Sequence, residues 1–176
     1  CFDHDLSRNL EGVRVEGLSK ATVCSTVTAP LAALLANSRK TTTKWHPDWR
    51  LPIKVAEPGR ITRSIYNGQP DPYNSNAIAS CAPASAKLPD GKPIAVLCKQ
   101  MEQATTDANG SQGLAADSQN GVPSRITRYT YNQWGQVLTE QDARGATTTH
   151  SYYADTVAGA HTMGDKQSTT NAIGQV

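Results

Sequence analysis

Apolar and polar residues alternate along several short stretches of this chain. In the stretch Asn9–Leu18, Val13 and Val15 alternate with charged neighbours, which is the two-residue period of a half-buried strand. The stretch Ala21–Thr28 alternates in the same way and predicts a second strand, joined to the first by a hairpin turn at Gly17.

An apolar run follows at Ala29–Ala36 and predicts one or two helical turns, with Pro30 at the first helical position. It is the longest apolar stretch of the chain and is too short to span a membrane, so no membrane span is expected. Residues 1–38 are therefore predicted to form an N-terminal β segment.

Residues 39–66 carry three β-prone stretches separated by turn residues. The predicted strands and turns are, in order, Arg39–Trp45, a turn at His46–Trp49, Arg50–Ala56, a turn at Glu57–Gly59, and Arg60–Tyr66.

The same pattern recurs in residues 125–153. The sequence Arg-Ile-Thr-Arg at Arg60 is repeated at Arg125, and a Tyr-Asn pair follows both copies. Turns are predicted at Asn132–Gly135 and Asp142–Gly145, where the glycines supply a positive φ. The sequence of Asn171–Val176 restarts the pattern, which leads us to expect a section of a longer repeat protein.

The two copies are separated by an insertion at about residues 67–122, within a repeat region that covers residues 39–176. Lys92–Gln100 is the one stretch of the insertion that predicts a strand. Gln103–Ser124 has little apolar periodicity and predicts a long polar loop.

Four cysteines, with no pair in CxxC spacing, argue against a zinc ribbon or a thioredoxin-like site. A disulfide between Cys81 and Cys98 is favoured because the segment between them contains a strong turn signal at Leu88–Pro93. Cys1 would then pair with Cys24 by elimination. The alternative is four free thiols in a reducing cytoplasm.

Composition and charge narrow the function classes. Aromatic residues make up only 6% of the chain, and Thr, Ser, Asn and Gly are abundant, which suits short strands joined by polar turns. The net charge is +2, from 17 basic and 15 acidic residues without a basic stripe, so no nucleic-acid partner is expected.

No catalytic or cofactor site is predicted. Asp3, His4 and Asp5 are adjacent, and adjacent side chains of a strand point to opposite faces, so they do not converge on a metal. His46 precedes a proline and is expected to be a turn residue, and the chain has no GxSxG elbow. We therefore expect no cofactor and no enzymatic activity.

The stretch from Tyr129 to Tyr153 resembles the YD repeat of the RHS family. In that pattern a Tyr-Asp pair is followed by glycine, an apolar strand, a turn with glycine, a Thr-rich strand and a second Tyr. Asn stands here where the family usually has Asp, and Tyr66-Asn67 marks a more divergent copy. The motif residues are Tyr66, Asn67, Tyr131, Asn132, Gly135, Asp142, Gly145 and Tyr152.

The resemblance covers about residues 39–66 and 125–176 and implies a fold and a role. RHS proteins are large, β-rich polypeptides whose strands spiral into a hollow shell around a toxic C-terminal domain. We therefore expect an all-β fold, in which YD-repeat antiparallel β-hairpins form part of a curved shell-like sheet with long polar loops. The acidic self-processing motif found in some members is not present in this sequence.

The function implied is that of a non-catalytic structural section of such a shell, in a toxin-delivery protein that is secreted or at the bacterial cell surface. The expected partners are the remaining repeats and the C-terminal effector of the parent chain. Exposed sheet edges are expected to favour self-association.

The alternative function is a carbohydrate- or cell-surface-binding β module. Trp45, Trp49 and Trp134 could form an aromatic strip on which surface glycans stack. The competing interpretation is that the regularly placed aromatic side chains pack across strands between repeats.

Overall fold

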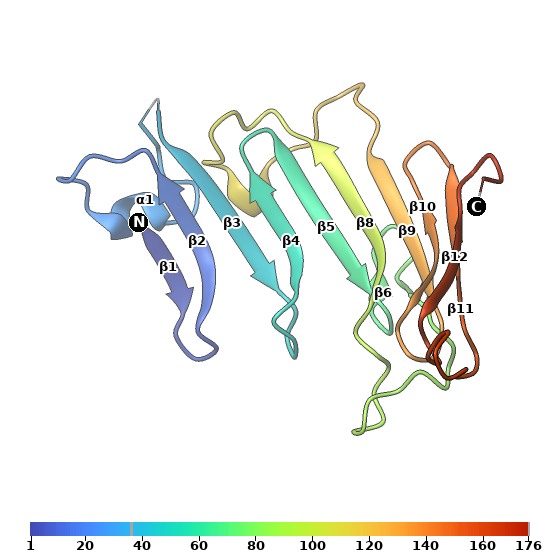
Figure 1. Ribbon diagram of the computed structural model, residues 1–176. Helices are drawn as coiled ribbons and strands as arrows, with labels where there is room; N and C mark the ends of the chain where they lie inside the picture. The colour runs from blue at the N-terminus through green and yellow to red at the C-terminus, as the bar shows by residue number, and fades with distance from the viewer. Residues whose placement is uncertain (36, 176) are drawn as a thin grey trace. The chain divides into compact units, whose positions relative to one another are not determined.

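The computed structural model describes residues 1–35 and 37–175, and its regular structure is mainly antiparallel strands (Figure 1). The expected all-β class is confirmed, with one large antiparallel sheet that is not closed. The shell-like curvature and the family detail remain predictions. Ala36 and Val176, the last residues of two stretches discussed above, lie outside the described residues.

The chain divides into two compact units. Unit 1 comprises Cys1–Ser64 and Met101–Arg125, and unit 2 comprises Ile65–Gln100 and Ile126–Val176. This division separates the parts of the chain that make most of their contacts internally. The boundaries expected near residues 38, 67 and 122 were instead placed where the repeated sequence begins and ends. Those boundaries stay a prediction.

Unit 1 is built from successive antiparallel strands that largely follow the predicted alternation. Val15, Ala56 and Ile61 are fully buried and form part of its core. The strands are β1 (Phe2–Asp5), β2 (Leu10–Glu16), β3 (Arg39–Trp45), β4 (Pro52–Glu57), most of β5 (Arg60–Tyr66) and the end of β8 (Leu97–Ala104).

The strand predicted at Ala21–Thr28 was wrong, because this stretch contains the helix α1 (Cys24–Thr28). The hydroxyls of Thr26 and Thr28 donate to the carbonyls of Val23 and Cys24, so these residues satisfy local bonds in place of a strand ladder. Strand β2 pairs with β1 and β3, and the predicted hairpin does not form.

The helical turns predicted after Pro30 were also wrong. The helix ends before Pro30 and turn and irregular backbone follow, with Leu31 at φ 55°. A proline next to a helix C-terminus stops the helix, because its ring and its missing N–H prevent another turn.

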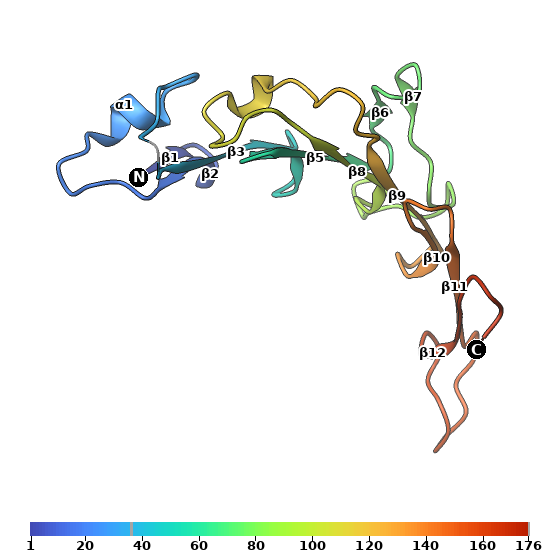
Figure 2. The ribbon, with the colours of Figure 1, turned by 90° about the horizontal axis from the view of Figure 1, so that it is seen from above.

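One face of unit 1 is covered by α1 and by the 3-10 helix η1 (Gly113–Ala115), as Figure 2 shows. The loop at Gly110 lies so close to β3 that only glycine fits there. Gly110 has a φ of 80°, and a Cβ at this position would collide with the carbonyl oxygen of Lys40. The backbone N–H of Lys40 donates to the carbonyl of Asn109 at 2.9 Å, which fixes this loop to β3.

Unit 2 contains the second predicted repeat, and its three strands form where the sequence predicts them. The strands of unit 2 are β9 (Arg125–Tyr131), β10 (Val137–Gln141), β11 (Thr147–Tyr152) and β12 (Lys166–Thr170), preceded by the start of β8 and by the short β6 (Pro70–Asp71) and β7 (Ala77–Ile78). The β6–β7 hairpin lies over one face beside β8 and β9 (Figure 2).

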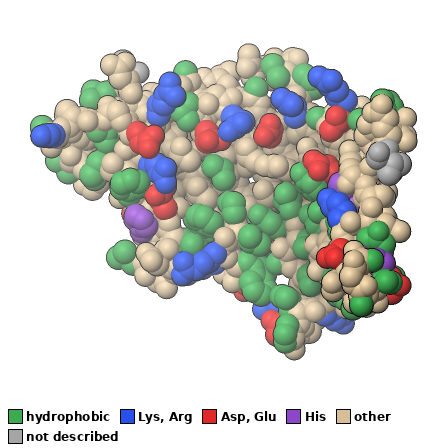
Figure 3. Space-filling view, viewed as in Figure 1, with side chains coloured by type: hydrophobic (Ala, Val, Ile, Leu, Met, Phe, Trp, Pro, Cys, Tyr) green, Lys and Arg blue, Asp and Glu red, His purple; other side chains and the backbone are tan. Residues whose placement is uncertain are grey.

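The insertion supplies a full strand of the sheet. The strand order is β1-β2-β3-β4-β5-β8-β9-β10-β11-β12, so β8 has β5 on one side and β9 on the other. Strand β8 covers Leu97–Ala104, which corrects the prediction of a strand at Lys92–Gln100 followed by a loop from Gln103. On the face seen in Figure 3, basic and acidic side chains are interspersed and form no single-sign patch.

Candidate functional site

Three turns in unit 2 repeat one hydrogen-bond pattern. At Asn132, the side-chain Oδ1 accepts the backbone N–H groups of Trp134 and Gln136, both at 3.0 Å. Its Nδ2 donates to Gln136 Oε1 at 2.7 Å. The backbone N–H of Gly135 donates to the Asn132 carbonyl at 3.1 Å, and the positive φ of 79° suits glycine.

The turn at Asn171 is the same. Asn171 Oδ1 accepts the N–H groups of Ile173 and Gln175 at 3.1 and 3.0 Å, and its Nδ2 donates to Gln175 Oε1 at 2.8 Å. The turn at Asp142 repeats the acceptor half of the pattern. An Asx residue therefore organises each turn through its own side chain, for which Asn and Asp are equivalent acceptors.

Two tyrosines make equivalent cross-strand bonds. The hydroxyl of Tyr131, at the end of β9, donates to the carbonyl of Leu97, the first residue of β8, at 2.8 Å. The hydroxyl of Tyr152, at the end of β11, donates to the carbonyl of Val137, the first residue of β10, at 2.9 Å. Each tyrosine thus fastens the end of its strand to the start of the preceding strand.

Tyr131 is buried, and its surroundings favour the neutral phenol. Burial, followed by the nearby Tyr129, Glu140 and Tyr66, raises the pKa of Tyr131 to about 12. A neutral hydroxyl is the form that can donate to a carbonyl, so the environment and the hydrogen bond agree.

The Tyr66-Asn67 copy departs from this geometry. Buried Asn67 accepts the N–H of Cys81 on Oδ1 at 3.1 Å and donates from Nδ2 to the Ile94 carbonyl at 3.3 Å. Its backbone N–H donates to the Val96 carbonyl at 2.9 Å. Asn67 therefore holds the inserted segment in place, where Asn132 organises a tight turn.

Both expected disulfides form. Cys1 is bonded to Cys24 and Cys81 to Cys98, and none of the four cysteines is free. The Cys81–Cys98 bridge ties the inserted segment to β8 beside Asn67. Two disulfides are compatible with an extracellular or secreted protein.

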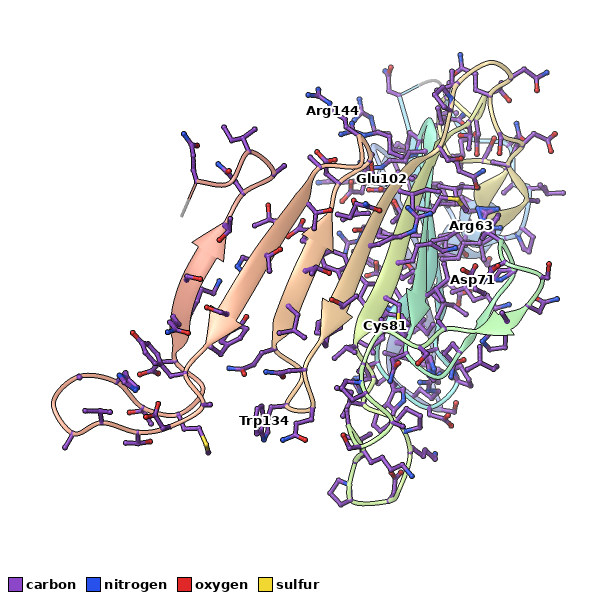
Figure 4. The ribbon with its side chains drawn as sticks, turned by 90° about the vertical axis from the view of Figure 1, so that its right-hand side faces the viewer. Arg63, Asp71, Cys81, Glu102, Trp134 and Arg144 are labelled. Carbon is purple, nitrogen blue, oxygen red and sulfur yellow. A yellow bond between two sulfur atoms is a disulfide. The ribbon has the colours of Figure 1, made fainter. Side chains whose placement is uncertain are left out.

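The three tryptophans do not lie together in one unit. Trp45 in unit 1 donates its Nε1–H to the Glu11 carbonyl at 2.8 Å, and Trp49 is half-buried in the turn that follows. Trp134 belongs to unit 2 and is 63% exposed at the turn between β9 and β10 (Figure 4). Of the three, Trp134 therefore offers the most accessible ring.

Trp134 borders a small pocket of about 380 Å³ with Gln136, Met163, Gly164 and Asp165. Gln136 Nε2 donates to the Gly164 carbonyl at 2.6 Å, which fixes the Asn132 turn to the loop before β12. An exposed indole beside amide and carboxylate groups is a suitable surface for stacking on a sugar ring.

Three of the histidines make local contacts. Buried His46 accepts the N–H groups of Asp48 and Trp49 on Nδ1, at 3.1 and 3.2 Å, which is the expected turn role. His150 Nδ1 lies 2.9 Å from Thr169 Oγ1 on the neighbouring strand. His161 stacks on Tyr153. Within residues 1–35 and 37–175, no group of three His, Cys, Asp or Glu could hold a metal ion.

Unit 1 has an apolar pocket of about 360 Å³ between the face of β2–β3 and the residues around α1 and η1. Lys40 lies at its base, 2% exposed, and its Nζ donates to the Ala29 carbonyl at 2.5 Å. Burial lowers the pKa of Lys40, and Asp107 opposes this effect. Because its ammonium already has an acceptor, Lys40 fastens the segment after α1 to the sheet.

A second pocket, of about 470 Å³, is polar and lies in unit 2 under the β6–β7 hairpin. Asp71, Lys99 and Arg128 are its charged residues. Sequence reasoning missed this group, because its members come from the short strand β6, from the strand in the insertion and from the second Arg-Ile-Thr-Arg copy. A usable signal was Lys99, a charged residue directly after the apolar run Pro93–Cys98.

No helix in the described part of the chain is long and apolar enough to cross a membrane. A scan against models of known protein families and a search of curated proteins find no match for this chain.

Proposed function

We propose that this chain is a non-catalytic structural section of a repeat-built β-sheet wall of the RHS/YD-repeat kind. The observation that carries the proposal is the repetition of one bonding scheme. The turns at Asn132 and Asn171 share three side-chain bonds and two backbone bonds, the backbone pair being Gly N–H to the Asn carbonyl and Asn N–H to the Gln carbonyl. Tyr131 and Tyr152 make the same cross-strand bond.

Such a scheme is suited to extension by repetition. A single hairpin unit cannot bury a face by itself, so neighbouring copies must complete the sheet. Strand β12 is the last strand in the order, and an edge strand presents unpaired N–H and C=O groups. The turn after β12 matches the turn that joins β9 to β10, so a strand following it would return along β12.

The partners in this proposal are further repeats of a parent chain and a C-terminal effector enclosed or presented by the wall. This assignment rests on the resemblance of the Tyr131–Tyr152 segment to YD repeats. A secreted or bacterial cell-surface location is part of the same proposal. The two disulfides support a location outside the cytoplasm, because disulfides persist in oxidising compartments.

The test is to extend the chain by one more repeat. A copy of Leu138–Tyr152 is appended directly after Val176, since Asn171–Val176 matches the start of the second repeat. We expect the appended copy to fold onto β12 and to shift the urea midpoint of unit 2 upward. The matched control carries the same fifteen residues in scrambled order, and an equal midpoint for both extended chains would contradict the proposal.

A second candidate is a glycan-binding role, favoured by the exposed Trp134 and its pocket. The test is binding to a glycan array. If the array retains the original protein and does not retain Trp134→Ala, the glycan-binding role is favoured over a purely structural one. Trp134→Tyr is the matched control, because it keeps an aromatic ring at the same turn position.

A further inference from the structure

The polar pocket of unit 2 has fixed walls. Its floor is formed by β8 and β9, with the Cys81–Cys98 disulfide at one side, and the β6–β7 hairpin lies over it. Figure 4 shows Asp71 on this hairpin and Cys81 between it and the turn that carries Trp134. The disulfide and the hairpin hold the pocket in shape before any ligand arrives.

An ion pair forms one wall. Lys99 Nζ bonds to Asp71 Oδ2, and both side chains are close to nine-tenths buried. Asp71 Oδ1 accepts the N–H of Tyr73 at 2.9 Å, and the Lys99 ammonium lies 5.8 Å from the centre of the Tyr73 ring. The charges of Asp71 and Lys99 therefore cancel each other. The two residues also hold Tyr73, whose side chain is 44% exposed.

Arg128 provides the unbalanced charge of the pocket. It lies on β9, is exposed, and its guanidinium forms no hydrogen bond or ion pair within residues 1–35 and 37–175. Thr130 lies two residues further along the strand and shares its face, because side chains alternate along a strand. With Asp71 and Lys99 cancelling, the pocket carries one net positive charge.

We propose that this pocket binds an acidic saccharide through the carboxylate of a uronic-acid residue. Arg128 would take the carboxylate in a two-pronged, charge-assisted contact. The exposed ring of Tyr73 would stack on the apolar face of the sugar ring, and Thr130 and Asn74 would bond its hydroxyls. One free cation matches the single charge of one carboxylate.

This inference goes beyond the structural role and does not depend on it, since a wall section can present a binding pocket on its surface. It is also separate from the Trp134 surface, which shares no lining residue with this pocket.

The experiment measures binding of trigalacturonate and of the neutral galactotriose to the intact disulfide-bonded chain by titration calorimetry. We expect trigalacturonate to bind and galactotriose to bind at least about tenfold more weakly, the effect of one charge-assisted contact. Arg128→Gln should lose about tenfold in affinity for trigalacturonate. Because Arg128 is exposed, this change leaves the buried ion pair intact.

The matched control is Arg144→Gln, which removes an exposed arginine of the same unit at the turn between β10 and β11, outside the pocket (Figure 4). It should bind as the original chain does. Equal losses in the two variants would reduce the effect to general charge attraction and overturn the proposal. Absence of trigalacturonate binding, equal binding of galactotriose, or displacement by equimolar inorganic phosphate would also overturn it. Trp134→Ala should leave trigalacturonate binding unchanged, which separates this site from the glycan candidate above.

Discussion

Replacing Tyr131 by phenylalanine tests the cross-strand bond on which the repeat scheme depends. The substitution removes one hydroxyl and keeps the buried ring, so packing is preserved. The lost bond is 2.8 Å long and joins a buried hydroxyl to the Leu97 carbonyl. A buried hydrogen bond of this kind contributes about 1 kcal/mol net, and an acceptor left without its partner adds to the cost. We expect a loss of about 1–2 kcal/mol in the free energy of unfolding.

The assay is urea unfolding followed by circular dichroism, with Tyr129→Phe as the matched control. Tyr129 lies on the same strand two residues away, and its hydroxyl has no hydrogen-bond partner within the described residues. Its replacement should cost less than about 0.5 kcal/mol. Equal costs for the two variants would refute the claim that the Tyr131 hydroxyl fastens β9 to β8.

The pH dependence gives a second readout on the same residue. The folded-state pKa of about 12 lies above the reference value of 10.0, so the folded state holds the proton more tightly. The resulting stabilisation is complete below pH 10 and is lost as pH rises from 10 to 12; it amounts to at most about 2.7 kcal/mol. Tyr131→Phe should lose that part of the alkaline decline. An unchanged decline between pH 10 and 12 would contradict the assignment.

Three further substitutions test other parts of the fold by the same unfolding assay. Gly110→Ala should lower the free energy of unfolding by more than about 3 kcal/mol, because a Cβ there collides with the backbone of Lys40. Gly121→Ala has a similar φ but open space around the Cβ, and it should cost about 1 kcal/mol. Similar costs for the two variants would contradict the close approach of Gly110 to β3. Asn132→Ala should lower the free energy of unfolding by about 1–2 kcal/mol. Asn132→Asp should cost much less, since Asp keeps the oxygen that accepts both backbone N–H groups. Equal costs for the two variants would show that this acceptor does not stabilise the turn. Replacing Cys81 and Cys98 together by serine should lower the free energy of unfolding by about 3 kcal/mol, because the unfolded chain gains entropy without the bridge. An unchanged free energy of unfolding would mean that the bridge does not stabilise the protein.

The sequence was most informative where local chemistry decides the structure. Strands β9 to β11 form where predicted, because the turns at Asn132 and Asp142 are organised by their own side chains and by glycines with positive φ. The disulfide pairing followed from a turn signal inside one loop. These features depend on neighbours within a few residues.

Features set by distant contacts could not be predicted. The stretch Ala21–Thr28 has a strand-like alternation, yet its cysteine is bonded to Cys1 and its threonines bond locally, so a helix forms. Strand β8 begins five residues later than expected, because the N–H of Ile94 donates to the Ala86 carbonyl within the inserted loop. The charged pocket combines Asp71, Lys99 and Arg128, which only the tertiary fold brings to one place.

The central claim is that β12 is an edge prepared for a further repeat. The most direct measurement is amide hydrogen exchange at Lys166–Thr170 in the chain extended by a copy of Leu138–Tyr152, compared with the scrambled extension. If the repeat scheme extends the sheet, the amides of β12 that point away from β11 will become protected in the first chain alone. Equal exchange at β12 in both chains would contradict the account.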